Sequence, residues 1–261
     1  MRLKKIADCK YTLEELVAEP KALDEVRHHL LKGTAFRIPH SISIFKLKEF
    51  KNKLNENFDL IDDTYTARVK NVKNYRQRHW DHTNQVVPAK FISWSYFPWN
   101  NESKPLFNTL INLFILRNLL ANLDKFKYLN GDDCEATARL AFQFYPKGEG
   151  YMHEHQDPQS KHQLALPTLL LSDYGLDYNL GGFYALDENN EKVIFDKTLK
   201  FGDLTLFHPS IPHGVAPIDP DELIDDCKSI NEGRLMMIAG VNNYAGVEGK
   251  YKANISNASK I

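Results

Sequence analysis

The feature of this chain that most limits its fold is a change in sequence texture near residue 136. From there to about residue 245, short runs typical of β-strands alternate with clusters of Gly, Pro, Asp and Asn. The runs are ATARLAFQFY, LALPTLLL, GGFYAL, EKVIFD, GDLTLF, HGVAPI and RLMMIAGVNN. Strands at this spacing, separated by turn residues, are typical of an all-β barrel or a double-sheet roll. We therefore predict a jelly-roll-like β core over residues 136–245.

The residues before this core have a mixed pattern that contains three helical segments. Apolar residues recur at helical spacing over Leu13–Leu31, and Thr12 with Glu15 forms a capping-box signature at its start. Phe45–Asn57 is a shorter helical segment. Pro105–Phe126 has a wide apolar face and begins with a proline, which suits the first position of a helix. We expect a helix in each of the three.

No linker, internal repeat or low-complexity block divides the sequence. Hydrophobic residues make up 43% of the 261 residues, which is enough for one large core. The sequence therefore predicts a single domain, mainly β with flanking helices. Residues 1–135 are expected to form a helical, lid-like region outside the core at 136–245, and residues 246–261 a C-terminal tail.

Charge and cysteine content limit the partners and the compartment. The formal net charge is −1, from 33 basic and 34 acidic residues, so no global basic excess points to nucleic acid or to an anionic membrane. The three cysteines, Cys9, Cys134 and Cys227, form neither a CxxC pair nor a disulfide framework. The N-terminus lacks the apolar run of a signal peptide. We expect a cytoplasmic protein with no nucleic-acid or membrane partner and with a small-molecule substrate.

Two histidines and an aspartate form the most informative constellation in the core. His155 and Asp157 are two residues apart, and on an extended strand residues i and i+2 project to the same face. His213 follows much later in the chain, and a β roll brings distant strands together. Two imidazoles and a carboxylate on one face of a metal, with the other face open, suit a non-haem Fe(II) that activates oxygen.

Other ligand sets are available from the neighbouring histidines. His153 with His155 would suit a cupin-type site, but that site needs a glutamate several residues later, which this sequence lacks. His208 is expected to face away from the site, because it lies an odd number of residues before His213. Zinc hydrolysis with the same two histidines and aspartate stays an alternative, although the HExxH motif is absent.

The order of motifs in the core resembles that of the Fe(II)/2-oxoglutarate-dependent dioxygenases, particularly the phytanoyl-CoA-dioxygenase-like small-molecule hydroxylases. Five elements, spread over roughly residues 136–243, carry the resemblance. They are His155-Gln156-Asp157, Gly181-Gly182-Phe183-Tyr184, Gly202-Asp203, Pro212-His213-Gly214-Val215 and Gly233-Arg234. The N-terminal region carries no motif of the family.

The resemblance implies a double-stranded β-helix core, a jelly-roll or cupin-like architecture. It also implies that His155, Asp157 and His213 hold Fe(II), with 2-oxoglutarate and O2 as cosubstrates. Arg234 would bind the distal carboxylate of 2-oxoglutarate. A guanidinium suits that role because it donates two parallel hydrogen bonds to a planar carboxylate.

Two departures from the family pattern concern the cosubstrate site. The stretch between His213 and Arg234 is longer than is common in the family and reads as an inserted polar loop or short helix. Met236 stands where the family often has a serine that also contacts the carboxylate. The candidates for that second contact are Gln143, Tyr145 and Thr168.

Substrate contacts are expected from the mouth of the roll and from the segment Tyr75–Trp99 before the core. This segment mixes cations with aromatic residues, as a lid over a polar or anionic small molecule would. A partly buried aromatic loop with a solvated face is the alternative. The candidate substrate-binding residues are Arg76, Arg78, His79, Trp80, Arg139, Lys161 and His162.

The resemblance implies an enzyme that hydroxylates an unactivated C–H bond of a small polar metabolite, such as an amino acid or a natural-product intermediate, and forms succinate and CO2. Asp157 favours hydroxylation over halogenation, because halogenases of the superfamily have a small residue in its place. Desaturation and cyclisation use the same ligands and stay open. The alternatives are a non-enzymatic β-roll protein that binds a ligand, and the same oxygenase chemistry on a peptide or a nucleobase.

Overall fold

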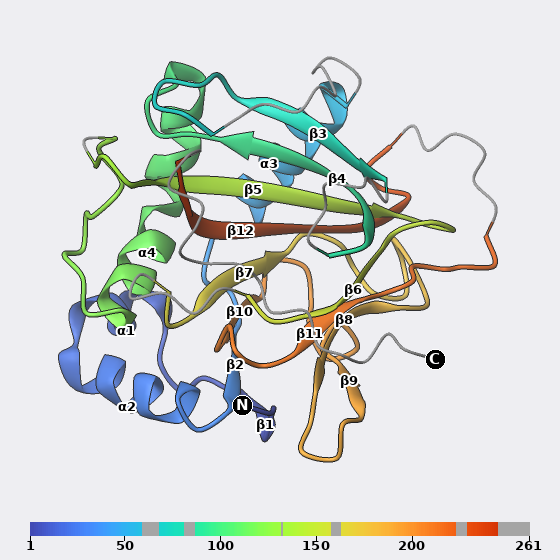
Figure 1. The fold of residues 1–261 in the computed structure, drawn as a ribbon, viewed down its shortest axis with the longest axis horizontal. Helices are drawn as coiled ribbons and strands as arrows, with labels where there is room; N and C mark the ends of the chain where they lie inside the picture. Colours follow the sequence, from blue (N-terminus) through green and yellow to red (C-terminus); the bar gives the residue numbers. More distant parts are fainter. Residues whose placement is uncertain (59–67, 81–86, 132, 158–162, 223–228, 245–261) are drawn as a thin grey trace.

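The structure is a computed structural model, and Figure 1 shows a curled β-sheet with helices packed along its outer side. The described residues are 1–58, 68–80, 87–131, 133–157, 163–222 and 229–244. The tail expected at 246–261 lies outside them, as do two of the candidate substrate-binding residues, Lys161 and His162.

All the described helices precede the core strands. They are α1 (Leu13–Ala18), α2 (Pro20–Leu30), α3 (Ile44–Glu56), the short 3-10 helix η1 (Asn101–Ser103) and α4 (Lys104–Leu120). The helix predicted over Leu13–Leu31 is two helices, because Pro20 has no N–H for a continuous helix and the preceding Glu19 is extended. The predicted capping box is confirmed, since the Thr12 hydroxyl accepts from the Glu15 N–H at 3.2 Å and the Glu15 carboxylate accepts from the Thr12 N–H at 2.8 Å.

The other two predicted helices are present with small changes at their ends. The helix predicted over Phe45–Asn57 is α3. Helix α4 ends at Leu120 and is shorter than predicted, because Asn122 has a left-handed φ of 56° that a helix cannot continue through. None of the helices in the described ranges is both long and apolar enough to cross a membrane.

Twelve strands of the described residues form one sheet. The N-terminal region contributes β1 (Lys5–Asp8), β2 (Thr34–Ile38), β3 (Tyr75–Trp80) and β4 (Ala89–Tyr96). The core contributes β5 (Ala136–Pro146), β6 (Tyr151–His155), β7 (Leu166–Leu170), β8 (Gly182–Leu186), β9 (Lys192–Ile194), β10 (Leu204–Phe207), β11 (His213–Ala216) and β12 (Gly233–Asn243). Each of the seven runs predicted from sequence texture contains a strand, and β6 is an eighth.

Apart from the hairpin of β8 and β9, successive core strands alternate between two halves of the sheet, which is the connectivity of a double-stranded β-helix. One half has the order β10-β7-β12-β5 and the other has the order β6-β11-β8-β9. Strand β4 joins the halves, because its residues 92–96 pair with β5 and its residues 89–90 pair with β6. The predicted fold class is therefore confirmed.

The N-terminal strands extend the first half of the sheet and were not predicted. Strand β2 pairs with β10 and β1, and β3 pairs with β4. Strand β2 is short and almost wholly buried, so it carries no alternation of polar and apolar residues that would mark it in the sequence. The region before residue 136 is thus part of the sheet as well as its helical cover.

The helices and the outer face of the first half bury the main hydrophobic core. Along β12, Leu235 and Met237 are buried in this core. Because side chains alternate along a strand, Met236 and Ile238 project to the inner face. Both of them line a cavity between the two halves of the sheet.

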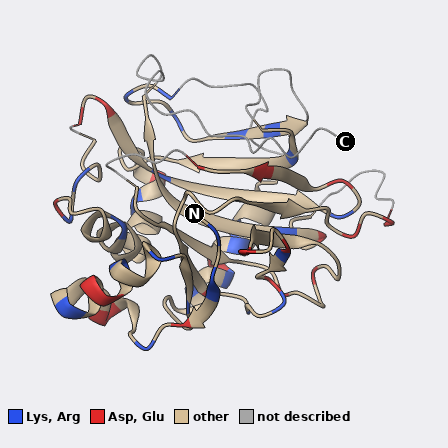
Figure 2. Cartoon of the chain, turned by 60° about the horizontal axis from the view of Figure 1, so that its bottom comes forward, with Lys and Arg blue, Asp and Glu red and all other residues tan. Residues whose placement is uncertain are grey.

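Charged residues of both signs are interspersed over the helices and loops of the described chain (Figure 2). This mixture agrees with the near-zero net charge of the sequence. The expectation that neither nucleic acid nor a membrane is a partner stays a prediction.

Candidate metal centre and its cavity

Two side chains from neighbouring strands, with a third that follows the first strand by two residues, form the candidate metal centre. His155 ends β6, His213 begins β11, and the two are direct partners in the antiparallel pair. The two carboxylate oxygens of Asp157 lie 3.3 Å from His213 Nε2 and 3.8 Å from His155 Nε2. Two donors that each lie about 2.1 Å from one ion cannot be more than about 4.2 Å apart. Both distances to Asp157 satisfy that limit.

Backbone carbonyls set the tautomer of both histidines. His155 Nδ1 lies 2.9 Å from the His153 carbonyl oxygen, and His213 Nδ1 lies 2.8 Å from the Ile211 carbonyl oxygen. A carbonyl can only accept a hydrogen bond, so each Nδ1 carries the proton. Each Nε2 therefore presents a lone pair on the side of Asp157, as metal ligation requires.

The protonation states of the ligands also favour a metal. Burial lowers the pKa of His155 to about 4, and the neighbouring His213 adds to the shift, so the ring is neutral at pH 7. Burial opposes ionisation of Asp157, and a cation held among the three side chains would favour the ionised form. Neutral imidazole and ionised carboxylate are the forms that bind a metal ion.

The three ligands line a cavity of about 140 Å³ between the halves of the sheet. The predicted cosubstrate contacts Gln143, Tyr145 and Thr168 line the same cavity. The Tyr145 hydroxyl donates to Gln143 Oε1 at 3.0 Å, and burial raises the pKa of Tyr145, so this hydroxyl stays a donor. Typical ligand pockets hold roughly 300–1,000 Å³, so this cavity suits a single small molecule.

Arg234 lies just behind the cavity wall at the start of β12. Its guanidinium carbon is 5.8 and 6.0 Å from the ring centres of Tyr145 and Phe183, which both line the cavity. Nε and Nη2 donate to the carboxylate of Asp196 at 2.6 and 3.1 Å. Burial opposes the charge, but Asp196 raises the pKa of Arg234 above its ordinary value.

The remaining nitrogen of this guanidinium is available for a ligand. Nη1 of Arg234 is buried and has no hydrogen-bond partner among the described residues. A buried donor without an acceptor is energetically costly and calls for an explanation. A carboxylate in the adjacent cavity would satisfy it.

Asp196 fixes the orientation of Arg234. It is fully buried and also accepts from the Tyr178 hydroxyl at 2.6 Å and from the Phe183 N–H at 2.8 Å. Gly182 makes this close approach possible, because its φ is +106° and a Cβ at that position would overlap the Asp196 carboxylate. The Gly-Gly motif therefore makes room for the acid that holds Arg234.

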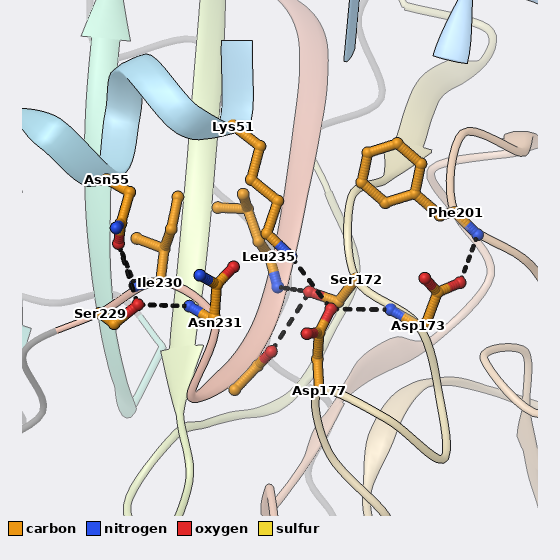
Figure 3. A network of polar contacts seen from close by, with 11 residues as sticks. Lys51, Asn55, Ser172, Asp173, Asp177, Phe201, Ser229, Ile230, Asn231 and Leu235 are labelled. Atoms are coloured by element: carbon orange, nitrogen blue, oxygen red, sulfur yellow. Dashed lines mark hydrogen bonds and ion pairs between the residues drawn. The ribbon is translucent and has the colours of Figure 1, made fainter. Parts of the chain in front are cut away.

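Ser172 fixes the backbone on both sides of Arg234 (Figure 3). Its hydroxyl donates to the Gly233 carbonyl at 3.2 Å and accepts from the Leu235 N–H at 2.6 Å. The loop after β7 thus bridges the two residues that flank the arginine.

Helix α3 anchors the same region from the outer side (Figure 3). The Asn55 side-chain oxygen accepts from the Ser229 hydroxyl and the Ile230 N–H, at 3.0 Å each. Lys51 Nζ pairs with Asp177 at 3.0 Å, in the loop that follows Ser172. The insertion predicted before Arg234 includes residues 223–228, which lie outside the described ranges, but its end is held by α3.

None of the five candidate substrate-binding residues in the described ranges lines the cavity, and three of them, Arg76, Arg78 and Trp80, lie on the other face of the sheet. Arg76 is buried, with its guanidinium carbon 5.1 Å from the Phe58 ring centre and 5.9 Å from that of Trp94, in the main core. Arg78 is exposed and stacks on Trp80 at 5.2 Å. These three contribute to the outer face of β3, where alternation along the strand places them.

Two other candidates lie on the inner face. His79 stacks on Phe91 with 4.1 Å between ring centres, and its Nε2 lies 2.9 Å from Ser93 Oγ. Phe91 in turn stacks on Tyr145 of the cavity wall at 5.3 Å. Arg139 lies on the inward side of β5, on the same face as Tyr145.

The competing histidines do not join the metal centre. His208 Nδ1 contacts the Ser210 hydroxyl at 2.7 Å, and His153 is exposed. In the part of the chain that is described, one group of three metal-ligating side chains is found, and its ligand atoms all lie within 4.8 Å of one another. It is the predicted set, so the geometry gives no support to a cupin-type set. Zinc would use the same three residues.

The residues that position Arg234, namely Asp196, Tyr178 and Ser172, were not predicted from the sequence. Each is a common residue in a short polar or mixed run with no motif of its own. The one available signal was the pair of glycines at 181–182, since glycine in a strand marks a place where another group approaches closely.

Comparison with known proteins gives no match to a protein-family model or to a curated protein. Solved structures do share the fold. A prolyl-4-hydroxylase of Pseudomonas putida is similar with a TM-score of 0.51 at 10% identity, over 89% of this chain and 96% of its own. The epimerase SnoN, in complex with Fe3+, alpha ketoglutarate and nogalamycin RO, gives a TM-score of 0.54 at 13% identity, over 88% of each chain.

At such low identity these similarities show the fold alone. The fold is the one that the sequence resemblance implied, the double-stranded β-helix of the 2-oxoglutarate oxygenases. SnoN is itself named a non-heme alpha ketoglutarate dependent enzyme from nogalamycin biosynthesis. Membership of the phytanoyl-CoA-dioxygenase-like branch stays a prediction.

Proposed function

We propose that this protein is an Fe(II)/2-oxoglutarate-dependent oxygenase that hydroxylates a small molecule. One observation carries the proposal. A single small cavity extends from a group of three metal ligands to the aromatic rings that contact a buried guanidinium with an unpartnered nitrogen. Two imidazoles and a carboxylate suit Fe(II), and the guanidinium suits the far end of a dicarboxylic acid.

The donor set fits a cation on electrostatic grounds. With both Nδ1 atoms protonated, the Nε2 lone pairs of His155 and His213 face the carboxylate of Asp157 at 3.8 and 3.3 Å. Such an arrangement is repulsive unless a positive ion lies among the three. Fe(II), with 2-oxoglutarate and O2, would supply the oxidant that attacks an unactivated C–H bond, with succinate and CO2 as coproducts.

The cosubstrate contacts follow from the free hydrogen-bonding groups. Arg234 would donate from Nη1 to the distal carboxylate, and the protonated hydroxyl of Tyr145 lies on the same side of the cavity. Thr168 Oγ1 is 3.5 Å from the Leu166 carbonyl, which is too long for a strong hydrogen bond. We therefore propose Thr168 as the hydroxyl that replaces the serine absent at position 236.

The reaction outcome and the substrate are proposed from the ligands and the size of the site. Asp157 keeps the full set of protein ligands, which favours hydroxylation. The fold itself does not choose the outcome, since a similar structure is named an epimerase. We propose a small polar metabolite as the substrate and the cytoplasm as the compartment, where the free cysteines Cys9 and Cys134 would stay reduced.

The proposal is tested with purified protein, Fe(II), ascorbate and 2-oxoglutarate. Slow succinate formation without added substrate is expected from the wild type. The variants His155→Ala and Asp157→Ala should lose iron binding, measured by metal analysis after desalting. His153→Ala is the matched control, because His153 is exposed and only its backbone carbonyl contacts the site.

Two results would contradict the proposal. A wild-type protein that binds neither iron nor 2-oxoglutarate would favour the non-enzymatic β-roll reading. Tight zinc binding with no effect of 2-oxoglutarate on the melting temperature would favour the zinc alternative, because a true cosubstrate stabilises the folded state by mass action.

A further inference from the structure

The cavity at the metal centre is too small for a cosubstrate and an organic substrate together. Its volume is about 140 Å³, below the roughly 300–1,000 Å³ of typical ligand pockets. Under the proposed function a five-carbon dicarboxylate occupies this space. The substrate must then lie against the inner face of the sheet beyond the cavity.

That part of the inner face can be followed along two paired strands. On β5, Gln143 lines the cavity, and Arg139 lies on the same face four residues earlier, about 14 Å along the strand. On β12, Ile238 lines the cavity, and Gly240 is the next inward position. Gly240 is the direct ladder partner of Arg139, so the two lie side by side beyond the cavity.

Arg139 has polar contacts but no acidic partner in this position. Its Nε donates to the Ser95 hydroxyl at 3.0 Å, and Nη1 makes a longer contact of 3.4 Å with the Asn242 side-chain oxygen. Within the described ranges no carboxylate pairs with it, and no hydrogen bond uses its Nη2. The guanidinium is held in place, and one of its nitrogens is left for another molecule.

The electrostatic surroundings of Arg139 favour an anion. Burial is the main cause that lowers the pKa of Arg139 to about 10; Tyr75 opposes the shift, and the positive charge of Arg68 adds to it. At pH 7 the side chain is still a cation. A partly buried cation that lies near a second cation, with no acid beside it among the described residues, is stabilised when an anion binds to it.

Gly240 leaves room for an additional atom beside Arg139. A Cβ placed on Gly240 would meet its nearest neighbours at 3.8 Å, which is ordinary van der Waals contact and no overlap. Both Arg139 and Gly240 are partly exposed, whereas Ala138 and Ala239 on the other face of these strands are fully buried. This inner face is therefore more exposed at Arg139 and Gly240 than the opposite face of the same two strands.

We propose that Arg139 binds an anionic group of the organic substrate, a carboxylate or a phosphate, and that the missing side chain of Gly240 leaves room for it. The inference rests on the proposed function and narrows its substrate to small organic acids. The substrate then spans from the anionic group at Arg139 to the C–H bond presented at the three metal ligands.

The test compares acids with their neutral analogues. Amino acids and short carboxylic acids are assayed beside their amides, and sugar phosphates beside the free sugars, for stimulated succinate release at saturating 2-oxoglutarate. Acids are expected to stimulate release and their neutral partners to fail. The responding class decides between a carboxylate and a phosphate. In Arg139→Gln, the KM for the stimulating acid should rise about 10- to 100-fold, the range for a lost hydrogen bond to a charged group.

Two further variants test the room beside Arg139 and control for the loss of a positive charge. Gly240→Leu adds a side chain beside Arg139 while it keeps the guanidinium, so it should also abolish stimulation, and a strand tolerates leucine better than glycine. Lys48→Gln, on the exposed face of α3, should change nothing. Both Arg139→Gln and Gly240→Leu should keep the rise in melting temperature on adding Mn(II) and 2-oxoglutarate, which shows that they fold and load.

The outcomes separate this inference from the proposed function. If wild-type protein shows no metal- and 2-oxoglutarate-dependent rise in melting temperature, the proposed function fails. If that rise is present but neutral compounds stimulate as well as acids, or no acid stimulates at all, only the role of Arg139 is overturned. An Arg139→Gln variant with an unchanged KM has the same meaning, and its polar contacts are then purely structural.

Discussion

Two arginines on the inner face of this sheet differ in their exposure to solvent and in the partners of their guanidinium groups. Arg234 is 2% exposed and is neutralised by Asp196, which is itself held by Tyr178 and by the backbone of Phe183. Arg139 is partly exposed and has only a hydroxyl and an amide oxygen as partners in the described chain. The guanidinium of Arg234 is thus held by an acid, whereas the guanidinium of Arg139 has only neutral partners in the described chain.

The difference indicates two kinds of recognition. A guanidinium that is oriented by a buried acid and a bridged backbone can accept only one geometry of ligand, which suits a cosubstrate that never changes. A guanidinium that has no counter-ion among the described residues and lies beside a glycine can accept acids of several shapes. The comparison therefore predicts that the two ends respond very differently to substitution.

The largest effect is expected at the acid that holds Arg234. Asp196→Asn leaves a buried guanidinium without its counter-ion and should lower the free energy of unfolding by about 3–5 kcal/mol. Urea unfolding at pH 7 measures the change. In an Arg234→Met background the same substitution should cost much less, because no buried charge is left unpaired. If Asp196→Asn lowers the free energy of unfolding by less than about 1 kcal/mol in the protein that retains Arg234, the role of Asp196 as its counter-ion is contradicted.

Removal of the metal and cosubstrate should have the next largest effect. At about 100 times their dissociation constants, ligands that bind only the folded state stabilise it by about 2.7 kcal/mol. EDTA should remove this gain, seen as a fall in melting temperature. Arg234→Lys should lose the increment that 2-oxoglutarate adds to that of the metal, whereas Arg139→Gln should keep it. Equal loss in both variants would mean that Arg234 and Arg139 contribute alike to 2-oxoglutarate binding.

A smaller effect is expected at the bridge beside Arg234. Ser172→Ala leaves the buried Leu235 N–H without its acceptor, which should destabilise the protein by about 1–3 kcal/mol. The affinity for 2-oxoglutarate should fall as well, because the backbone that carries Arg234 is no longer bridged. Calorimetric titration with Mn(II) present measures it. Ser43→Ala, an exposed serine without a side-chain cap bond, is the control.

The smallest effect on stability is expected at Arg139. Arg139→Gln removes a partly solvated charge and leaves no buried acid unpaired, so the free energy of unfolding should change by less than about 1 kcal/mol. The same urea experiment measures it. A loss as large as that of Asp196→Asn would show that Arg139 is structural and would erase the contrast between the two ends.

The sequence predicted the parts of the molecule that depend on local pattern. The core strands and the i, i+2 relation of His155 and Asp157 follow from alternation along a strand. The division of Leu13–Leu31 at Pro20 was missed, although proline is a known helix breaker, because the apolar spacing continues across it. The four N-terminal strands were missed because buried edge runs such as β2 lack alternation.

The supporting residues of the site depend on contacts between distant segments, which no local pattern encodes. Asp196 meets Arg234 across 38 positions of sequence, and Ser172 meets Leu235 across 63. Gln143, Tyr145 and Thr168 were predicted as alternatives for one contact, and all three line the cavity because each is an inward residue of its strand. Only the packed sheet shows that Thr168 has the weakest existing hydrogen bond.

The close approach of Gly182 to Asp196 also restricts which substitutions this sequence can accept during evolution. A methyl group at position 182 would overlap the Asp196 carboxylate, so an alanine there is tolerated only after the acid has shortened or moved. Asp196 cannot be substituted by itself either, since Arg234 would lose its counter-ion. Positions 182, 196 and 234 are therefore expected to change together or not at all. A related protein in which all three residues differ would need other residues to bind the distal carboxylate of the cosubstrate.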